Sequence, residues 1–332
     1  MISDSSAITP KAESPSRDAA LDLLRGGAVL YIVGYYHIQE IWVWRMPGSL
    51  AGWLARVALA LFCFLSGYLL GGKTRITDWK SVGSFYWRRL AKIYPLYLAA
   101  LYAFVQLGLA PRNLFLPSAL LINTLLNWNL LTLWFVSMIF LFYAVTPFYL
   151  WRPRPWKIGL ITAALIGVML VFRFESQWID PRLFPNLVAF AFGILLNHAP
   201  RLHKAFLQPR RRNLVTALVA LLVLAFLIGG KGPRDNDETH MIFVVYLFLA
   251  ALPWLIFLSR TACRWLSSGL IEFLATASFV LYLSHRIIDH FGEIFYHPAS
   301  PWLRQSWYLL VLLPVALVFS YGLQKLWQRV IP

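Results

Sequence analysis

Charged residues are scarce in this chain, and acidic residues are the scarcest. Only 13% of its 332 residues are Asp, Glu, Lys or Arg, whereas 59% are hydrophobic. Soluble globular proteins carry roughly a quarter charged residues, so the composition excludes an ordinary soluble domain and favours an integral membrane protein. The two cysteines show no metal-ligand spacing and no disulfide framework, which argues against a Cys-based zinc site and a disulfide-rich secreted fold.

The charges that are present are mostly basic. Lys and Arg number 30 against 14 Asp and Glu, which gives a formal net charge of +16. Such an excess can indicate nucleic-acid binding, but here the basic residues occur in short clusters between apolar runs. Clusters of this kind are typical of loops that face an anionic membrane leaflet. We therefore expect membrane lipids, and not nucleic acid, as partners.

Apolar runs long enough to cross a bilayer occur along most of the chain. A transmembrane helix needs about 20 apolar residues, and fewer where it is short or surrounded by other helices. The sequence predicts ten spans, at residues 22–42, 50–71, 91–109, 132–151, 157–172, 183–198, 213–229, 240–258, 270–291 and 306–327. Residues 1–18 are polar and rich in Ser and Pro, so we expect a disordered cytoplasmic tail before a single transmembrane domain over residues 19–332.

The stretch at residues 111–131 makes this count ambiguous, because it is apolar but interrupted by asparagines. It is either a re-entrant or surface-lying piece or an eleventh span. An eleventh span would invert the membrane orientation of every later span. Lys and Arg are retained on the cytoplasmic side, and with ten spans most of the thirty basic residues fall in cytoplasmic loops. The predicted fold is therefore an all-α polytopic membrane protein of about ten transmembrane helices, with both termini cytoplasmic.

Polar residues inside the first predicted span are functional candidates, because a charged or strongly polar group in lipid costs a few kcal/mol. Arg25 lies near the cytoplasmic end of this span, and His37 lies about 18 Å further along at 1.5 Å per residue. Imidazole is a natural general base near neutral pH. The alternative is a histidine that only satisfies a neighbouring carbonyl.

The ninth predicted span is the most polar after the first. On a helical wheel one stripe of it suits a lined cavity better than lipid. That stripe consists of Ser278, Tyr282, His285 and Asp289.

A basic group precedes the third predicted span. Arg88, Arg89 and Lys92 are spaced to share one helix face at the cytoplasmic surface. Such a face suits the phosphates of a nucleotide-bearing donor, or it anchors the protein to the membrane surface. Two further pairs also have two interpretations each. Ser66-Gly67 is either part of a site or a pair of small residues for helix packing. Trp134 and Ser137 either belong to a site, or Trp134 anchors the helix at the membrane interface and Ser137 bonds to a nearby backbone carbonyl.

Four segments, taken together in their order and spacing, resemble the acyltransferase-3 family of integral membrane acyltransferases. They are residues 22–26 with His37, residues 61–70, residues 85–97 and residues 133–137 with 142–143. Residues 278–285 are similar to the family's late-span signature. The resemblance covers nearly all of the chain after the polar tail.

The resemblance implies a ten-span enzyme of the bacterial inner membrane that needs no metal. It implies transfer of an acyl group, usually acetyl from cytoplasmic acetyl-CoA, to a hydroxyl of an extracytoplasmic glycan. Arg25 and His37 match an essential pair of the family, and Arg88 and Arg89 match its basic pair. The candidate residues are then Arg25, His37 and Ser137 for catalysis; Arg88, Arg89, Lys92 and Ser66 for the acyl-CoA; and Trp134, Tyr282, His285 and Glu40 for the acceptor.

The chain differs from the family pattern at two places. It has eleven residues between Arg25 and His37, one more than is usual, which leaves the pair about 120° apart on a continuous helix. A one-residue bulge near Gly34 or at the preceding Gly-Gly pair would return them to a common face. Many members also have glutamates after the Trp-x-x-Ser motif, which this chain lacks, so we expect an acidic partner from elsewhere, such as Glu40.

Two questions stay open at the level of sequence. The acyl group can pass directly from thioester to hydroxyl or through a transient acyl-enzyme on His37 or a serine. The rival to an enzyme is a non-enzymatic exporter of a polysaccharide or lipid intermediate, in which the polar first and ninth spans line a pathway.

Overall fold

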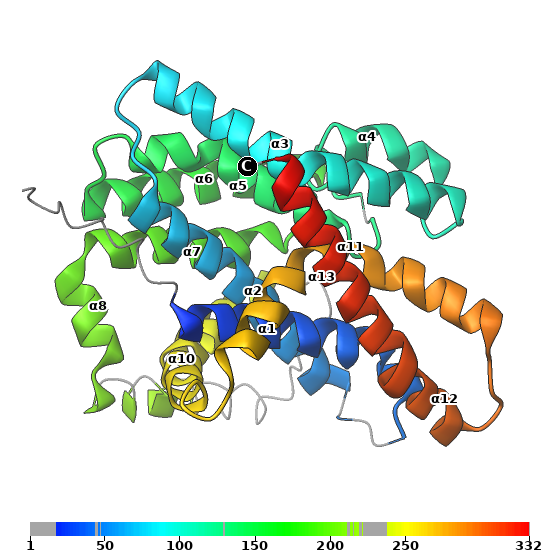
Figure 1. Cartoon of the computed structure of the whole chain (residues 1–332). Helices are drawn as coiled ribbons and strands as arrows, with labels where there is room; N and C mark the ends of the chain where they lie inside the picture. The colour runs from blue at the N-terminus through cyan, green and yellow to red at the C-terminus, as the bar shows by residue number, and fades with distance from the viewer. Residues whose placement is uncertain are drawn as a thin grey trace, which may run out of the picture.

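The computed structural model describes residues 18–43, 46, 48–128, 130–210, 213–214, 216–218, 221 and 238–331. Every regular element in these residues is a helix, and one isolated bridge joins Ile76 and Trp151. The α-helices are α1 (Ala19–Gly34), α2 (Gly48–Lys73), α3 (Trp79–Gln106), α4 (Phe115–Ala119), α5 (Trp134–Leu150), α6 (Pro155–Ser176), α7 (Leu183–His198), α8 (Pro200–Leu207), α10 (Glu238–Ala262), α11 (Ser268–Phe295), α12 (Pro301–Trp307) and α13 (Leu313–Val330) (Figure 1). The shorter elements are the 3₁₀ helices η1 (Tyr36–Ile41) and η2 (Arg112–Leu114) and a π-helical segment, η3 (Tyr308–Leu312).

The all-α prediction is confirmed, and several helices are suited to a membrane. Five helices in the described part of the chain are long and apolar enough to cross a bilayer: Leu50–Lys73, Pro155–Ser176, Met241–Ala262, Ser268–Phe295 and Pro301–Val330. A sixth is present if α7 and α8, which meet at 110°, form one broken span. The chain therefore has the helices of a polytopic membrane protein. The count of ten and the orientation of the termini stay predictions.

Two of the predicted regions fall largely outside the described residues. These are the predicted tail, except for its last residue, and most of the predicted span at residues 213–229. Asp18, the last residue of the tail, is the N-cap of α1, where its side chain accepts hydrogen bonds from the backbone N–H groups of Ala20 and Leu21. The transmembrane domain predicted from residue 19 therefore begins with a capped helix.

The third predicted span, at residues 91–109, is only the second half of a longer helix. α3 begins at Trp79 because Asp78 and Ser81 form a capping box, in which each side chain bonds to the other residue's backbone N–H. The Ser81 N–H donates to Asp78 at 2.7 Å and lowers the pKa of that carboxyl. The first half of α3 is amphipathic and carries the basic group, which is why hydropathy alone did not extend the helix to Asp78.

The stretch at residues 111–131 contains no helix of spanning length in its described part. It forms η2, α4 and a series of turns, and Leu121 and Asn127 have positive φ angles that interrupt regular structure. Tyr94 and Tyr97 of α3 donate hydrogen bonds to the carbonyls of Ala119 and Ser118. The piece is thus held against α3, which agrees with the broken, non-spanning alternative.

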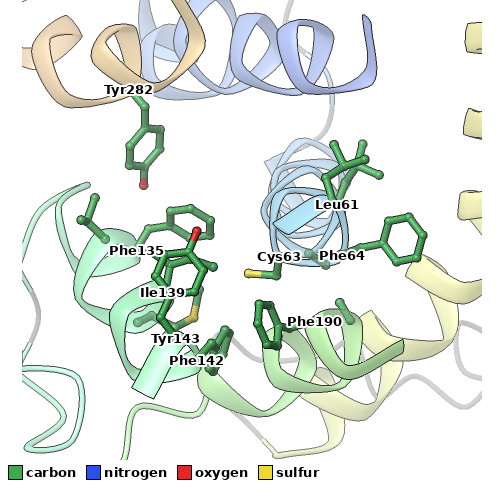
Figure 2. Close-up of a cluster of buried hydrophobic side chains, with 14 of the residues drawn as sticks. Leu61, Cys63, Phe64, Phe135, Ile139, Phe142, Tyr143, Phe190 and Tyr282 are labelled. Carbon is green, nitrogen blue, oxygen red and sulfur yellow. The ribbon is translucent and has the colours of Figure 1, made fainter. Parts of the chain in front are cut away.

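The core lies where α2, α5, α7 and α11 meet. Figure 2 shows aromatic side chains of α5 and α7 facing Cys63 of α2, with Phe64 on the side of α2 away from α5 and Tyr282 entering from α11. The rings of Phe142 and Phe190 are tilted by 37° with their centroids 5.4 Å apart, and Phe64 and Cys63 are both almost fully buried. This packing fixes the relative positions of the helices that carry the site.

Glycine allows α2 and α7 to approach at backbone contact. A Cβ atom added to Gly67 would collide with the carbonyl of Phe190, and one added to Gly193 would collide with the carbonyl of Phe64. Small residues at facing positions are the usual means by which membrane helices pack closely. The Ser66-Gly67 pair therefore serves helix packing, at least through Gly67.

Gly67→Ala is expected to destabilise the protein, because a helix backbone has to move away from Phe190 to admit one methyl group. Overpacking of this kind costs about 1–3 kcal/mol, which should appear as a lower midpoint of thermal unfolding in detergent. The matched control is Gly52→Ala in the same helix, where nothing lies within 4 Å of the added Cβ. Equal midpoints for the two variants would contradict the close α2–α7 contact.

α1 lies beside α11, and both run in the same direction, because Gly26 lies against Leu274 and His37 lies against His285. The C-terminal helix covers this pair from the other side. Its π-helical segment η3 ends two residues before Pro314, which cannot donate a backbone hydrogen bond. Tyr308 of η3 donates to the carbonyl of Val33 at 3.0 Å and so ties the end of α1 to the C-terminal helix.

Candidate active site

His37 lies just beyond the end of α1. The α-helix stops at Gly34, Tyr35 has φ −133° and ψ −64°, and the chain continues as the 3₁₀ helix η1. The change of helix type lies near Gly34, one of the two places where the sequence predicted a local irregularity. It turns the His37 ring toward α11.

The partner of His37 is the imidazole of His285. His37 Nδ1 and His285 Nε2 lie 2.8 Å apart, and the two rings are nearly parallel, with 6° between their planes. His285 has no exposed surface, and its Nδ1 lies 2.9 Å from the carbonyl of Tyr282 and 3.2 Å from that of Leu281. Both histidines thus belong to one hydrogen-bonded chain that begins at the α11 backbone.

This series of hydrogen bonds determines which ring nitrogen of a neutral His37 carries the proton. Carbonyl oxygens only accept hydrogen bonds, so Nδ1 of His285 must carry the proton that it shares with Tyr282. Nε2 of a neutral His285 is then an acceptor, and Nδ1 of His37 must donate to it. Nε2 of His37 is left with its lone pair, which is the form that a general base requires.

His37 lines a cavity of about 440 Å³. The cavity is bounded by the end of α1 and η1, the first turns of α2, the approach to α5, Arg182 just before α7, and α11. Its polar lining residues are Tyr36, His37, Arg56, Thr132, Arg182, Tyr282 and Arg286. Two of the four predicted acceptor residues, Trp134 and Tyr282, are among the lining residues, and a third, His285, lies behind His37.

Arg182 is held rigidly at one wall of the cavity. Its guanidinium pairs with the carboxylate of Asp180, which is 1% exposed, through hydrogen bonds from Nε and Nη2. The same guanidinium lies 3.7 Å above the centroid of the Trp134 ring. A planar cation between a carboxylate and an indole is strongly oriented. Trp134 therefore acts on the cavity mainly by positioning Arg182.

Arg286 lies next to the catalytic candidate. Its Nη1 donates to the backbone carbonyl of His37 at 3.4 Å, and its Nε is buried without a hydrogen-bond partner. Tyr282, one turn earlier on α11, donates to the carbonyl of Thr132 at 2.7 Å and closes the cavity against the approach to α5. Arg56 enters from the third turn of α2, on the lining of the same cavity.

The basic group of α3 lies away from this cavity. Arg88 and Lys92 are exposed, whereas the guanidinium of Arg89 is half-buried, 5.6 Å from the Tyr143 ring centroid. Tyr143 lies nine residues beyond Trp134 on α5, which corresponds to roughly 14 Å along the helix. The main chain at Lys92 accepts a hydrogen bond from Trp327, and the C-terminus accordingly lies beside α3 in Figure 1.

Four further predicted residues do not line the cavity. Arg25 forms an ion pair with Asp22 at 4.0 Å, in the half of α1 opposite to His37. Ser137 is buried and lies 3.0 Å from the hydroxyl of Tyr97, which itself donates to the carbonyl of Ser118. Glu40 is exposed on η1, and Ser66 is half-buried beside Gly67.

Sequence reasoning assigned no role to the cavity arginines. Arg56 and Arg286 were recognisable as charges inside predicted spans, which is by itself a signal of function. Arg182 gave no such signal, because it sits in a predicted loop and reaches the cavity only through the turn at Asp180. A helix-by-helix analysis does not reveal that these three side chains meet at one place.

A larger cavity of about 730 Å³ lies between α3, α5 and α6. Its lining is apolar except for Lys157, whose ammonium group donates to the carbonyl of Trp151. Among its described lining residues there is no His, Asp or Glu. Among the described residues, no cluster of three or more His, Cys, Asp and Glu side chains could hold a metal ion.

Comparison with known proteins adds a family to this geometry. No curated protein and no solved structure matches the chain. The family model for the acyltransferase domain of acyltransferase family 3 does match it, over residues 18–325. This match covers every helix that carries the site, including η3 and most of α13. The chain therefore belongs to acyltransferase family 3 and is a membrane acyltransferase.

Proposed function

We propose that this acyltransferase moves an acetyl group from acetyl-CoA, bound from the cytoplasmic side, to a hydroxyl of an extracytoplasmic glycan. The observation that carries the proposal is the hydrogen-bonded pair of His37 and His285 at the wall of a polar cavity. It supports a base with a defined lone pair beside space for a substrate. The family membership supports acyl transfer as the reaction.

His37 is the general base in this proposal. Its Nε2 takes the proton of the attacking hydroxyl while the hydroxyl oxygen bonds to the thioester carbonyl carbon. The carbon–sulfur bond then breaks, the acetyl ester forms, and the proton on His37 passes to the departing thiolate, which leaves as CoA. Atoms and charge balance without a metal or an acyl-enzyme.

Arg286 is the proposed donor to the oxyanion that forms on the thioester oxygen. Arg25 and Ser137, the candidates from sequence, do not line the cavity, whereas Arg286 does and already bonds to the His37 backbone. A preorganised donor at a developing negative charge contributes more in a water-poor site than in water. The buried Nε of Arg286 supports this role, because it has no other partner in the described structure.

The basic group of α3 is the proposed site for the CoA phosphates. Arg88 and Lys92 present exposed charges, and Arg89 is oriented by its contact with Tyr143. These groups lie deeper along the bundle than the cavity, roughly 14 Å away along α5. The long pantetheine arm of CoA is the part of the donor that has to bridge such a separation.

We also propose the bacterial inner membrane as the location of the enzyme.

Replacing Arg88 and Arg89 by Gln is expected to raise the KM for acetyl-CoA with little change in kcat. The phosphates contact the enzyme equally in the ground state and the transition state, so their loss weakens binding without changing the barrier from the bound state. Two charge-assisted contacts correspond to an effect on the order of 10²-fold in KM. Steady-state rates in proteoliposomes measure it, with the exposed Arg201→Gln on α8 as the control. A fall in kcat at unchanged KM would contradict this assignment.

The proposed function is tested by mass spectrometry of surface glycans from cells with and without the gene, and after complementation. Loss of ester-linked acetyl groups from an otherwise complete glycan supports the enzyme. Loss of the glycan itself, with acetylation of the remainder unchanged, would instead identify an exporter and overturn the proposal.

A further inference from the structure

The cavity beside His37 holds an unusual set of polar groups. Three guanidinium groups line it, from Arg56, Arg182 and Arg286, and they come from three different parts of the chain. Among the described lining residues there is no Asp, Glu, Asn or Gln. The lining is therefore rich in hydrogen-bond donors and poor in acceptors.

This donor-rich lining does not suit a neutral sugar. Sugar hydroxyls donate as well as accept, so a site for a neutral sugar needs acceptor side chains and an aromatic face. The indole of Trp134, the largest aromatic group on the lining, already carries the Arg182 guanidinium on one face. Carboxylate and phosphate groups, in contrast, only accept, and they match the fork of a guanidinium.

The number of positive charges also exceeds what the reaction needs. The transition state develops one negative charge, and Arg286 beside His37 is placed to receive it. Asp180 offsets the charge of Arg182 from behind the cavity wall. Arg56 adds a further positive charge to the cavity lining from α2, and a charge inside a membrane protein is costly to place.

We infer that the acceptor is an anionic glycan, with a carboxylate or phosphate group on or next to the acetylated sugar that binds Arg56 and Arg182. This inference rests on the proposed function, because it assigns the cavity to the acceptor. The two arginines hold the negative group across the cavity from His37. This binding directs the neighbouring hydroxyl of the sugar toward His37 Nε2.

Binding of small probes to the purified protein in detergent tests the inference. The probes are D-glucuronate, D-glucose 6-phosphate, D-glucose and inorganic phosphate, at matched ionic strength and with saturating CoA present. We expect one of the two charged sugars to bind at least about tenfold more tightly than glucose and inorganic phosphate, the contribution of one charge-assisted pair. Arg56→Gln should reduce that preference to less than twofold. Arg112→Gln, which removes an exposed charge from η2 outside the cavity, should leave it unchanged.

Several outcomes would overturn the inference. They are equal affinity for the charged and neutral sugars, a preference that survives Arg56→Gln, inorganic phosphate binding as tightly as glucose 6-phosphate, or failure of both charged sugars to bind while CoA is saturating. His37→Ala separates this inference from the function on which it rests, since it should stop acyl transfer and keep the charge preference. If the protein prefers charged sugars but acetylates no glycan, the proposed function fails and the anion site remains.

Discussion

His37→Ala is expected to lower the rate of acetyl transfer by about 10² to 10⁴-fold, the usual contribution of a positioned general base. The reason is that no other imidazole among the described lining residues faces the cavity, and His285 uses both of its ring nitrogens within the hydrogen-bonded chain. The measurement is transfer of labelled acetyl from acetyl-CoA to isolated surface glycan by proteoliposomes. The KM for acetyl-CoA should change little, because the phosphates bind elsewhere.

The control for this experiment is His297→Ala. His297 is an exposed histidine just after the end of α11, so its loss removes an imidazole without touching the cavity. Both variants should insert and show similar thermal unfolding midpoints. Undiminished transfer by a well-folded His37→Ala protein would exclude His37 as the base.

The sequence was sufficient to predict the helical class and most helix positions, because apolar runs of spanning length are a direct physical requirement of the bilayer. α7 occupies the predicted residues 183–198, and α11 contains the predicted span at residues 270–291. Boundaries failed where another interaction set them. The capping box at Asp78 extends α3, and the change to a 3₁₀ helix after Gly34 shortens α1.

The sequence predicted which polar residues of each single helix are candidates for the site, but not which of them meet in the fold. The stripe of Ser278, Tyr282 and His285 is buried, as the helical wheel indicated, and His37 was singled out as a polar group within a span. The contact between His37 and His285 was not predictable, because it depends on α1 and α11 lying in parallel. Arg25 forms an ion pair with Asp22 on its own helix, and its role in catalysis stays a prediction.

The contact between the two histidines has a consequence for the spacing of the first span. One extra residue lies between Arg25 and His37 relative to the family pattern, and the helix changes type at Tyr35 before it reaches His37. In the proposed mechanism the reaction requires a fixed direction of the His37 ring, and His285 contacts that ring from another helix. A register change within α1 is therefore compatible with activity as long as the ring still reaches α11.

We accordingly propose that His285 is a positioning residue, so the effects of its substitutions should follow hydrogen-bond chemistry and not side-chain shape. His285→Phe keeps an aromatic ring but removes the acceptor for His37 Nδ1, so the His37 ring can turn or change tautomer, and kcat should fall on the order of 10²-fold or more. His285→Gln changes the shape more but restores an acceptor oxygen, and it should recover part of that loss. The KM for acetyl-CoA should stay near the wild-type value in both variants.

A merely structural role for His285 predicts the opposite order. His285 is completely buried, so a packing role would make Phe, which is closer in shape and apolar, the milder substitution for both stability and activity. Measuring kcat together with the thermal unfolding midpoint of the two variants therefore separates the roles. If Phe were as active as Gln at equal stability, the hydrogen bond from His37 would have no part in catalysis. The tautomer of His37 would then have to be set by another group.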